Sequence, residues 1–210
     1  MQLTRNHSIK EIKPTTLSNH KGMIYTNDWF SHNIPNWKIW LKKFKNKENL
    51  SFLEIGCYEG MATKWLLDNI LTCNNSSITV VDTFNGSIEH QKIDNTKMLR
   101  NFINNIGSDK RVRIFSTTSK QFLKTTEELY NFVYIDASHK AKDVMSDAIL
   151  AWDKLKQNGI LIFDDYEWKK FPKTSNLHPK MAIDCFLEMY KEEYKLIGKN
   201  YQVCIMKTIS

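Results

Sequence analysis

The stretch Phe52-Leu-Glu-Ile-Gly-Cys-Tyr-Glu-Gly-Met61 decides the fold of this chain. It opens with a short, mostly apolar run that is typical of a buried strand, and it leads directly into a helical pattern. Gly56 and Gly60 stand between the two, where a tight turn lets a ligand approach the backbone and the N–H groups of the next helix. The spacing is G-x-x-x-G rather than G-x-G-x-x-G, which argues against a nicotinamide cofactor.

Four more short apolar runs follow along the chain, separated by stretches with helical periodicity. The runs occupy residues 78–81, 112–115, 132–135 and 160–163. The helical stretches occupy residues 61–71, 96–106, 119–126 and 139–156. Apolar strands that alternate with helices are typical of a parallel sheet covered on both faces.

The C-terminal part of the chain has a different pattern. A helical stretch at 181–193 precedes two strand-like runs, at 194–197 and 202–206, which are joined through residues 198–200. A link this short permits only antiparallel pairing. We therefore predict an α/β fold, a Rossmann-like doubly wound sheet of seven strands, mostly parallel, with an antiparallel C-terminal hairpin and helices on both faces.

Two segments flank or interrupt this core. Residues 1–34 are polar, show no sustained periodicity and are interpreted as an N-terminal arm, so the main domain is expected at 35–210. Residues 35–46 carry tryptophan, leucine and phenylalanine at helical spacing and predict a helix that covers the sheet. Residues 166–180 are long for a strand-to-helix link and are a candidate lid insertion.

The composition describes an ordinary folded protein. The 210 residues are 41% hydrophobic and 12% aromatic, which excludes a disordered or fibrous chain. The net charge of +7 is compatible with nucleic acid or an anionic substrate. Lysine dominates the positive charge, however, and base-reading surfaces rely on arginine, so we interpret most of the excess as a solvated face and do not expect a nucleic-acid partner.

The cysteines and the N-terminus indicate the cellular setting. Cys57, Cys73, Cys185 and Cys204 are widely spaced and form no C-x-x-C pair, so they are interpreted as reduced thiols. The first residues contain no apolar leader, and no stretch has the roughly 18 apolar residues of a membrane span. We expect a cytoplasmic protein with no membrane partner.

An acidic residue at the end of the second run indicates a ribose. A carboxylate at this strand end, here that of Asp82, can accept hydrogen bonds from both hydroxyls of a ribose that lacks a 2′-phosphate. A glycine turn or a terminal aspartate is also ordinary turn chemistry when it stands alone. In this order and spacing the two features reinforce each other.

At this point the sequence resembles the class I S-adenosylmethionine-dependent methyltransferases, over roughly residues 50–206. Glu54-x-Gly56-x-x-x-Gly60 resembles their first motif, and Val81-Asp82-Thr83-Phe84 resembles their second. The resemblance implies that the first motif lines the methionine side, that Asp82 holds the ribose, and that Thr83 or Phe84 lies near the adenine. The residues expected at the cofactor on this basis are Glu54, Gly56, Cys57, Tyr58, Gly60, Asp82, Thr83, Phe84, Ser116 and Ser119.

Three acids follow the fourth and fifth runs. Asp136 comes directly after residues 132–135, and Asp164 and Asp165 come directly after 160–163. Neighbouring parallel strands bring these carboxylates to one edge of the sheet, where they repel one another unless a cation lies between them. Oxygen ligands of this kind suit Mg²⁺, so we predict a divalent metal site made by the three aspartates. The alternative is that the Asp-Asp pair is a helix cap or a turn.

His139 follows Asp136 by three positions. We expect it on the first turn of the helix at 139–156, where residues three apart share one face, so that its imidazole points at a hydroxyl held by the metal. A neutral imidazole accepts a proton near pH 7. His139, as general base, and Asp136 are therefore the predicted catalytic residues.

The pattern Asp-x-x-His followed by Asp-Asp resembles metal-dependent small-molecule O-methyltransferases, especially those that act on sugar hydroxyls of macrolide antibiotics. Catechol-type enzymes have a lysine where His139 stands and Asp-Asn where Asp164-Asp165 stands, so both differences favour the sugar type. The resemblance implies an S-adenosyl-L-methionine-dependent O-methyltransferase that uses a divalent metal, Mg²⁺, and modifies a hydroxyl of a small molecule, a sugar or a nucleotide sugar.

Two other functions stay open. The charge of +7 favours an RNA or other nucleic-acid methyltransferase, although neither the Asn-Pro-Pro-Tyr or Asp-Pro-Pro-Tyr motif of amino-group methylation nor the Lys-Asp-Lys-Glu pattern of ribose methylation is recognisable. A non-catalytic module that keeps the cofactor fold is disfavoured, because the acids and His139 are retained. The acceptor and the oligomeric state, including a homo-oligomer, are not fixed by the sequence.

Overall fold

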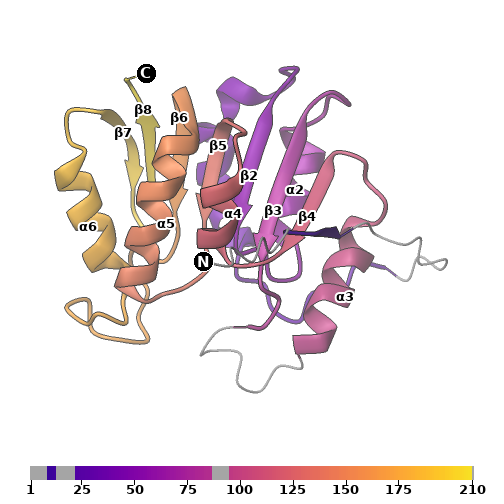
Figure 1. Ribbon diagram of the computed structural model, residues 1–210, viewed down its shortest axis with the longest axis horizontal. Helices are drawn as coiled ribbons and strands as arrows, with labels where there is room; N and C mark the ends of the chain where they lie inside the picture. Colours follow the sequence, from indigo (N-terminus) through magenta and orange to yellow (C-terminus); the bar gives the residue numbers. More distant parts are fainter. Residues whose placement is uncertain (1–8, 13–21, 87–94, 210) are drawn as a thin grey trace, which may run out of the picture.

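The computed structural model describes residues 9–12, 22–86 and 95–209. Within these ranges one sheet has the strand order β1-β4-β3-β2-β5-β6-β8-β7 (Figure 1). The parallel strands are β2 (Ser51–Ile55), β3 (Ser77–Asp82), β4 (Val112–Ser116), β5 (Tyr130–Ile135) and β6 (Leu155–Phe163). The antiparallel strands are β1 (Glu11–Ile12), β7 (Tyr194–Lys199) and β8 (Val203–Lys207).

The predicted fold class is confirmed, including the parallel core and the C-terminal hairpin, but the strand count of seven is wrong. The eighth strand is β1, which pairs antiparallel with β4 through Glu11 opposite Phe115 and Ile12 opposite Ile114. A two-residue strand is too short to show a period in the sequence, so it was hidden inside the predicted arm. Residues 1–8 and 13–21 of that arm lie outside the described residues.

Helices cover both faces of the sheet. The helices α1 (Ile34–Trp40), α2 (Met61–Asn69) and α3 (Asn95–Ile106) pack on one face, and α4 (Ser119–Thr125), α5 (Ala141–Lys154) and α6 (Pro179–Met189) pack on the other. In Figure 1, α4 and α5 lie in front of the sheet and α2 lies behind it. Alternate strand residues point to opposite faces, so the sheet divides the core into two apolar layers.

The segment 35–46 forms α1 and then a 3₁₀ turn, η2 (Lys42–Phe44), after the short 3₁₀ turn η1 (Ser31–Asn33). Its apolar stripe packs into the core against α2 and the sheet. The stripe residues are all buried: Trp37, Trp40, Leu41 and Phe44. Tight packing of this stripe fixes α1 over the strands that carry the acids.

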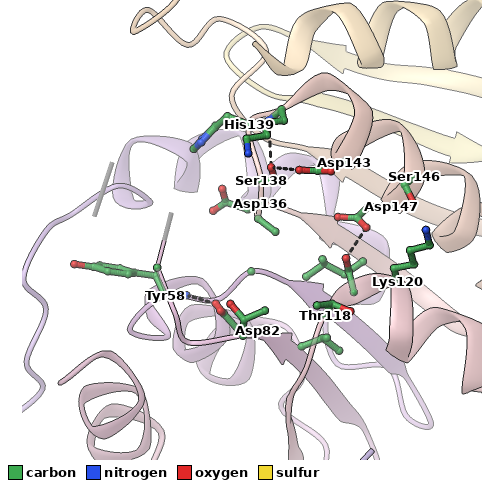
Figure 2. Close-up of a pocket in the computed structure, with 18 of the residues that line it drawn as sticks. Tyr58, Asp82, Thr118, Lys120, Asp136, Ser138, His139, Asp143, Ser146 and Asp147 are labelled. Atoms are coloured by element: carbon green, nitrogen blue, oxygen red, sulfur yellow. Dashed lines mark hydrogen bonds between the residues drawn. The ribbon is translucent and has the colours of Figure 1, made fainter. Parts of the chain in front are cut away.

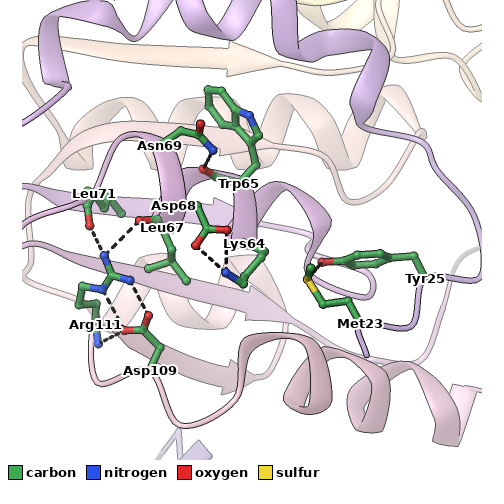
Figure 3. A network of polar contacts seen from close by, with 10 residues as sticks. All are labelled: Met23, Tyr25, Lys64, Trp65, Leu67, Asp68, Asn69, Leu71, Asp109 and Arg111. Atoms are coloured by element: carbon green, nitrogen blue, oxygen red, sulfur yellow. Dashed lines mark hydrogen bonds and ion pairs between the residues drawn. The ribbon is translucent and has the colours of Figure 1, made fainter. Parts of the chain in front are cut away.

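A polar network lies at the end of the sheet where the parallel strands begin (Figure 3). Arg111, just before β4, donates to the carbonyl oxygens of Leu67 (3.1 Å) and Leu71 and pairs with Asp109. These bonds tie the C-terminal end of α2 to the start of β4, at the amino ends of the parallel strands. The carboxyl ends of the strands, where ligands bind in such folds, lie at the other end of the sheet.

Each helix in the described ranges is too short or too polar to traverse a bilayer.

Candidate active site

The turn after β2 packs directly on the end of β5. Gly56 has φ +83°, and a Cβ atom built there would lie 2.0 Å from the carbonyl oxygen of Asp136. The Gly56 N–H donates to the Val81 carbonyl (2.9 Å), and the Asp136 N–H donates to that of Ile55 (2.8 Å). Only glycine combines a left-handed backbone with so close an approach to another strand, so the turn at Gly56 and Asp136 lie side by side.

Asp82 holds the same turn from the side of β3. Its Oδ2 accepts the N–H groups of Cys57 (2.9 Å) and Tyr58 (3.2 Å), and its Oδ1 accepts the N–H of Phe84 (2.8 Å). Figure 2 shows the carboxylate beside Tyr58 at the wall of the pocket. A carboxylate has about four lone-pair sites, so Asp82 can brace the turn and still accept a hydroxyl.

A cleft of about 930 Å³ opens at this edge of the sheet. Half of the predicted cofactor residues line it: Gly56, Tyr58, Asp82, Thr83 and Ser119. The other half do not: Glu54, Cys57 and Phe84 are buried, Gly60 precedes α2 with φ +83°, and Ser116 is exposed at the end of β4. The cleft is at the upper end of the size range of ligand sites and has room for two ligands.

Glu54 lies behind the turn. Its carboxyl accepts the Thr63 hydroxyl at 2.6 Å, and burial raises the pKa of Glu54 to about 8 in spite of that hydrogen bond. The hydrogen bond ties the end of β2 to α2 from inside the core. The part that the resemblance gives to Glu54, at the methionine end of the cofactor, stays a prediction.

Asp136 and Asp164 meet at one phenol. The Tyr134 hydroxyl lies 3.0 Å from Oδ2 of Asp136 and also bonds to Oδ2 of Asp164. Burial, and then the negative charges of Asp164 and Asp165, raise the pKa of Asp136. Burial, and then the charge of Asp165, raise the pKa of Asp164 to about 7. The two carboxylates of Asp136 and Asp164 therefore lie together at the ends of β5 and β6.

Asp165 faces a different set of partners. Its backbone is left-handed, with φ +58°, and its N–H donates to Oδ1 of Asp164 at 2.7 Å. Its Oδ1 accepts the Tyr201 hydroxyl (2.7 Å), and its Oδ2 lies 2.5 Å from Nε2 of His139. The His139 ring stacks on Trp168 at 4.1 Å between centroids.

The helical position predicted for His139 is wrong. The helix α5 begins at Ala141 after the extended residue Lys140, so Asp136 and His139 both lie in the loop that precedes it. Spacing on a helical turn therefore does not bring the two residues together. The bond from His139 to Asp165 and the stacking on Trp168 hold the imidazole at the acids instead.

The four predicted catalytic and metal-binding residues nevertheless face one small space. Asp136, His139, Asp164 and Asp165 line a cavity of about 10 Å³, beside the larger cleft. That volume is close to the minimum for a single water molecule. Among the described residues, no group of three or more His, Cys, Asp or Glu side chains has the arrangement of a metal cluster as it stands.

The segment 166–180 lies over this site. Trp168, Phe171 and Leu177 line the cleft. The buried His178 bonds through Nε2 to the Trp168 carbonyl at 2.7 Å, and the Asn176 carbonyl accepts the first N–H of α5 at 2.9 Å. These bonds place an apolar wall opposite the cofactor turn.

Apart from Ser119, sequence reasoning missed the residues that α4 and α5 contribute to the cleft. Asp147 is the clearest case: it lies between Val144 and Ala148 on the buried face of α5 and accepts the Ser119 hydroxyl at 2.5 Å (Figure 2). Burial raises the pKa of Asp147 to about 6. A carboxylate on the apolar stripe of a helix is the signal that could have identified it.

Comparison with known proteins agrees with this architecture. Residues 53–166 match a family described as "Methyltransferase domain". Among solved structures, an rRNA methylase from Streptococcus thermophilus is similar with a TM-score of 0.61 and 10% identity over 86% of this chain and 99% of that one. The O-methyltransferase TomG from Streptomyces achromogenes, in complex with SAM, has a TM-score of 0.61 and 12% identity over 83% and 80%.

A third similar structure is the MycE methyltransferase of the mycinamycin pathway, in complex with Mg, SAH and mycinamycin VI. Its TM-score is 0.59 with 13% identity, and the match covers 87% of this chain but only 50% of MycE. At such identities the likeness shows a common fold. None of the curated proteins matches the sequence.

Proposed function

The chain belongs to the methyltransferase-domain family of S-adenosylmethionine-dependent enzymes, and we propose that it methylates a hydroxyl of a small molecule, a sugar or a nucleotide sugar. The proposed reaction uses a divalent cation, Mg²⁺, and His139 as the base. The observation that carries the proposal is the single small cavity lined by Asp136, His139, Asp164 and Asp165 next to the glycine turn.

The cofactor would lie between the ends of β2 and β3. Gly56 and Tyr58 bring backbone to the cleft, and Asp82 offers a carboxylate for the ribose. Ser119, at the start of α4, lines the side where the resemblance puts the adenine. Glu54, behind the turn, would lie on the methionine side of the cofactor.

The acid cluster fits a hard cation. Its donors are carboxylate oxygens, and in the part of the chain that the structure describes no lysine or arginine bonds to Asp136, Asp164 or Asp165. Burial first, and then the neighbouring carboxylates, raise the pKa of Asp136 and Asp164, and a positive ligand would relieve the repulsion between these acids. These three aspartates would hold the ion. When bound, a divalent cation lowers the pKa of a hydroxyl that it contacts.

The protein groups then complete the transfer. The acceptor oxygen attacks the methyl carbon in line with the departing sulfur, and the products are the methyl ether and S-adenosylhomocysteine. His139 takes the hydroxyl proton, and Asp165, at 2.5 Å from its Nε2, orients the ring and stabilises the imidazolium. Trp168 stacks on one face of the ring and limits the access of water to it.

The lysines that line the cleft favour an acceptor that carries negative charge. Lys120, Lys140 and Lys142 line it, and none of them forms an ion pair within the described residues. The acids of the same wall bond to neutral donors, as Asp143 does to Ser138 at 2.9 Å. Free cations beside the apolar wall of segment 166–180 suit a sugar linked to a diphosphate.

The alternative is methylation of RNA, which the net charge of +7 favours. Incubation with labelled methyl donor and either a pool of nucleotide sugars or total RNA separates the two. We expect label in the sugar pool and none in RNA. Label in RNA alone, with binding that weakens steeply as salt rises, would replace the small-molecule proposal. No transfer to either pool, with the donor still bound, would favour a non-catalytic module.

A further inference from the structure

The Tyr134 hydroxyl is the point at which two acids of the proposed metal site meet. It bonds to Oδ2 of Asp136 at 3.0 Å and to Oδ2 of Asp164, and the side chain is fully buried. Tyr134 lies inside β5, two residues before Asp136, on the face that packs against α1. The rigid strand therefore fixes the position of the phenol oxygen.

A buried polar chain leads to this hydroxyl from α1. The indole Nε1 of Trp37 donates to Oε1 of Gln202 at 2.6 Å, and Nε2 of Gln202 lies 3.5 Å from the Tyr134 oxygen. Because an indole N–H can only donate, it turns the amide oxygen of Gln202 toward itself and the amide NH₂ toward Tyr134. The phenol oxygen then accepts from Gln202, and its own hydrogen is directed to the carboxylates.

Packing alone does not account for the hydroxyl. The Tyr134 ring meets Trp37 edge to face at 4.8 Å between centroids, and a phenylalanine would make the same contact. A buried hydroxyl costs stability unless it is hydrogen-bonded, and here its partners are the site carboxylates and Gln202. A neutral donor also leaves the negative charge of the acids available for a cation, whereas a lysine in this place would neutralise it.

We propose that Tyr134 is a positioning residue for the cation: its hydroxyl holds the carboxylates of Asp136 and Asp164 together at one point, and Gln202 and Trp37 orient that hydroxyl. The inference rests on the proposed function, because it gives Tyr134 a role only if the acids bind a metal. Partners of this kind orient metal ligands, and their loss commonly weakens metal binding by about 10- to 100-fold.

Tyr134→Phe tests the inference, with Tyr130→Phe as the matched control. Tyr130 is also fully buried on β5, but its hydroxyl contacts Glu128 at 3.5 Å, at the other end of the strand. The probe is Mn²⁺ alone, and its free concentration is measured by electron paramagnetic resonance. We expect wild type and Tyr130→Phe to bind Mn²⁺ equally and Tyr134→Phe to bind it about 10- to 100-fold more weakly. Calorimetry should show the same affinity for S-adenosylhomocysteine in all three.

The outcomes separate the inference from the proposed function. If wild type binds Mn²⁺ saturably and the affinity of Tyr134→Phe is within twofold of that of wild type, the inference alone is overturned. Absence of saturable binding to wild type overturns the metal part of the proposed function, and the inference with it. If Tyr134→Phe does not fold, Gln202→Met takes its place. This variant keeps the phenol but removes the side chain that orients its hydroxyl. Unchanged Mn²⁺ affinity in Gln202→Met also overturns the inference.

Discussion

The imidazole of His139 and the carboxylate of Asp165 approach to 2.5 Å between Nε2 and Oδ2. Asp165 has a left-handed backbone, with φ +58°. The side chains of the two consecutive aspartates have different partners: Asp164 bonds to Tyr134, and Asp165 bonds to His139 and Tyr201. Strained backbone of this kind is commonly found at functional sites.

Removal of the His139 imidazole should slow the reaction and leave the cofactor bound. His139→Ala should lower kcat by roughly 10² to 10⁴, the usual contribution of a general base. Calorimetry with S-adenosylhomocysteine should give the affinity of wild type, because the ring contacts Asp165 and Trp168 rather than the glycine turn. A variant that turns over at the rate of wild type would remove His139 from the mechanism.

Substitution of Asp82 should weaken cofactor binding. In Asp82→Asn one side-chain oxygen becomes an NH₂ group, which meets a backbone N–H of the turn as a second donor. Leaving the N–H of the buried Cys57 without its acceptor costs about 1 to 3 kcal/mol, or roughly 5- to 150-fold in affinity if the turn must form to bind the cofactor. Asp143→Asn is the control, because it changes the charge of the same cleft but not the turn. Equal affinity in both variants would exclude Asp82 from the cofactor site.

The contact between the glycine turn and β5 should not tolerate a methyl group. Gly56→Ala combines a positive φ with a Cβ atom 2.0 Å from a backbone oxygen, so we expect a loss of at least about 3 kcal/mol in the free energy of unfolding. Gly107→Ala is the matched control, with φ +66° and no atom within 4 Å, and it should cost only about 1 to 2 kcal/mol. Urea unfolding compares the two, and equal losses would contradict the close approach.

Asp147 should give the stability of the protein a measurable pH dependence. Burial raises the pKa of Asp147 in the folded state to about 6, above the value near 4 of an unfolded chain. The folded state therefore binds this proton more tightly, and the stability that it contributes is complete below pH 4 and is lost as the pH rises through 6. Relative to Asp147→Asn, wild type should lose about 3 kcal/mol or less in unfolding free energy between pH 4 and 7. A difference between the two proteins that does not change with pH would refute the shift.

The fold could be predicted because its strands are short apolar runs, which leave little doubt about a buried parallel sheet. The sequence could not reveal β1, since two residues have no period, nor the true start of α5, since the N-cap residue Lys140 is not one of the types that mark a helix start. The acids were predicted from their places at strand ends. Their partners were not predicted. Tyr134 has the pattern of a core residue of β5, and the bond between His139 and Asp165 joins two loops that are 26 residues apart in the sequence.

The dependence of methyl transfer on a divalent cation tests the central claim most directly. Transfer of labelled methyl from S-adenosylmethionine to a pool of nucleotide sugars would be measured in chelator, and again after Mg²⁺ is restored. We predict no transfer in chelator, full recovery with Mg²⁺, and no recovery in Asp164→Ala, although that variant still binds S-adenosylhomocysteine. Transfer at the same rate with and without chelator would contradict the account.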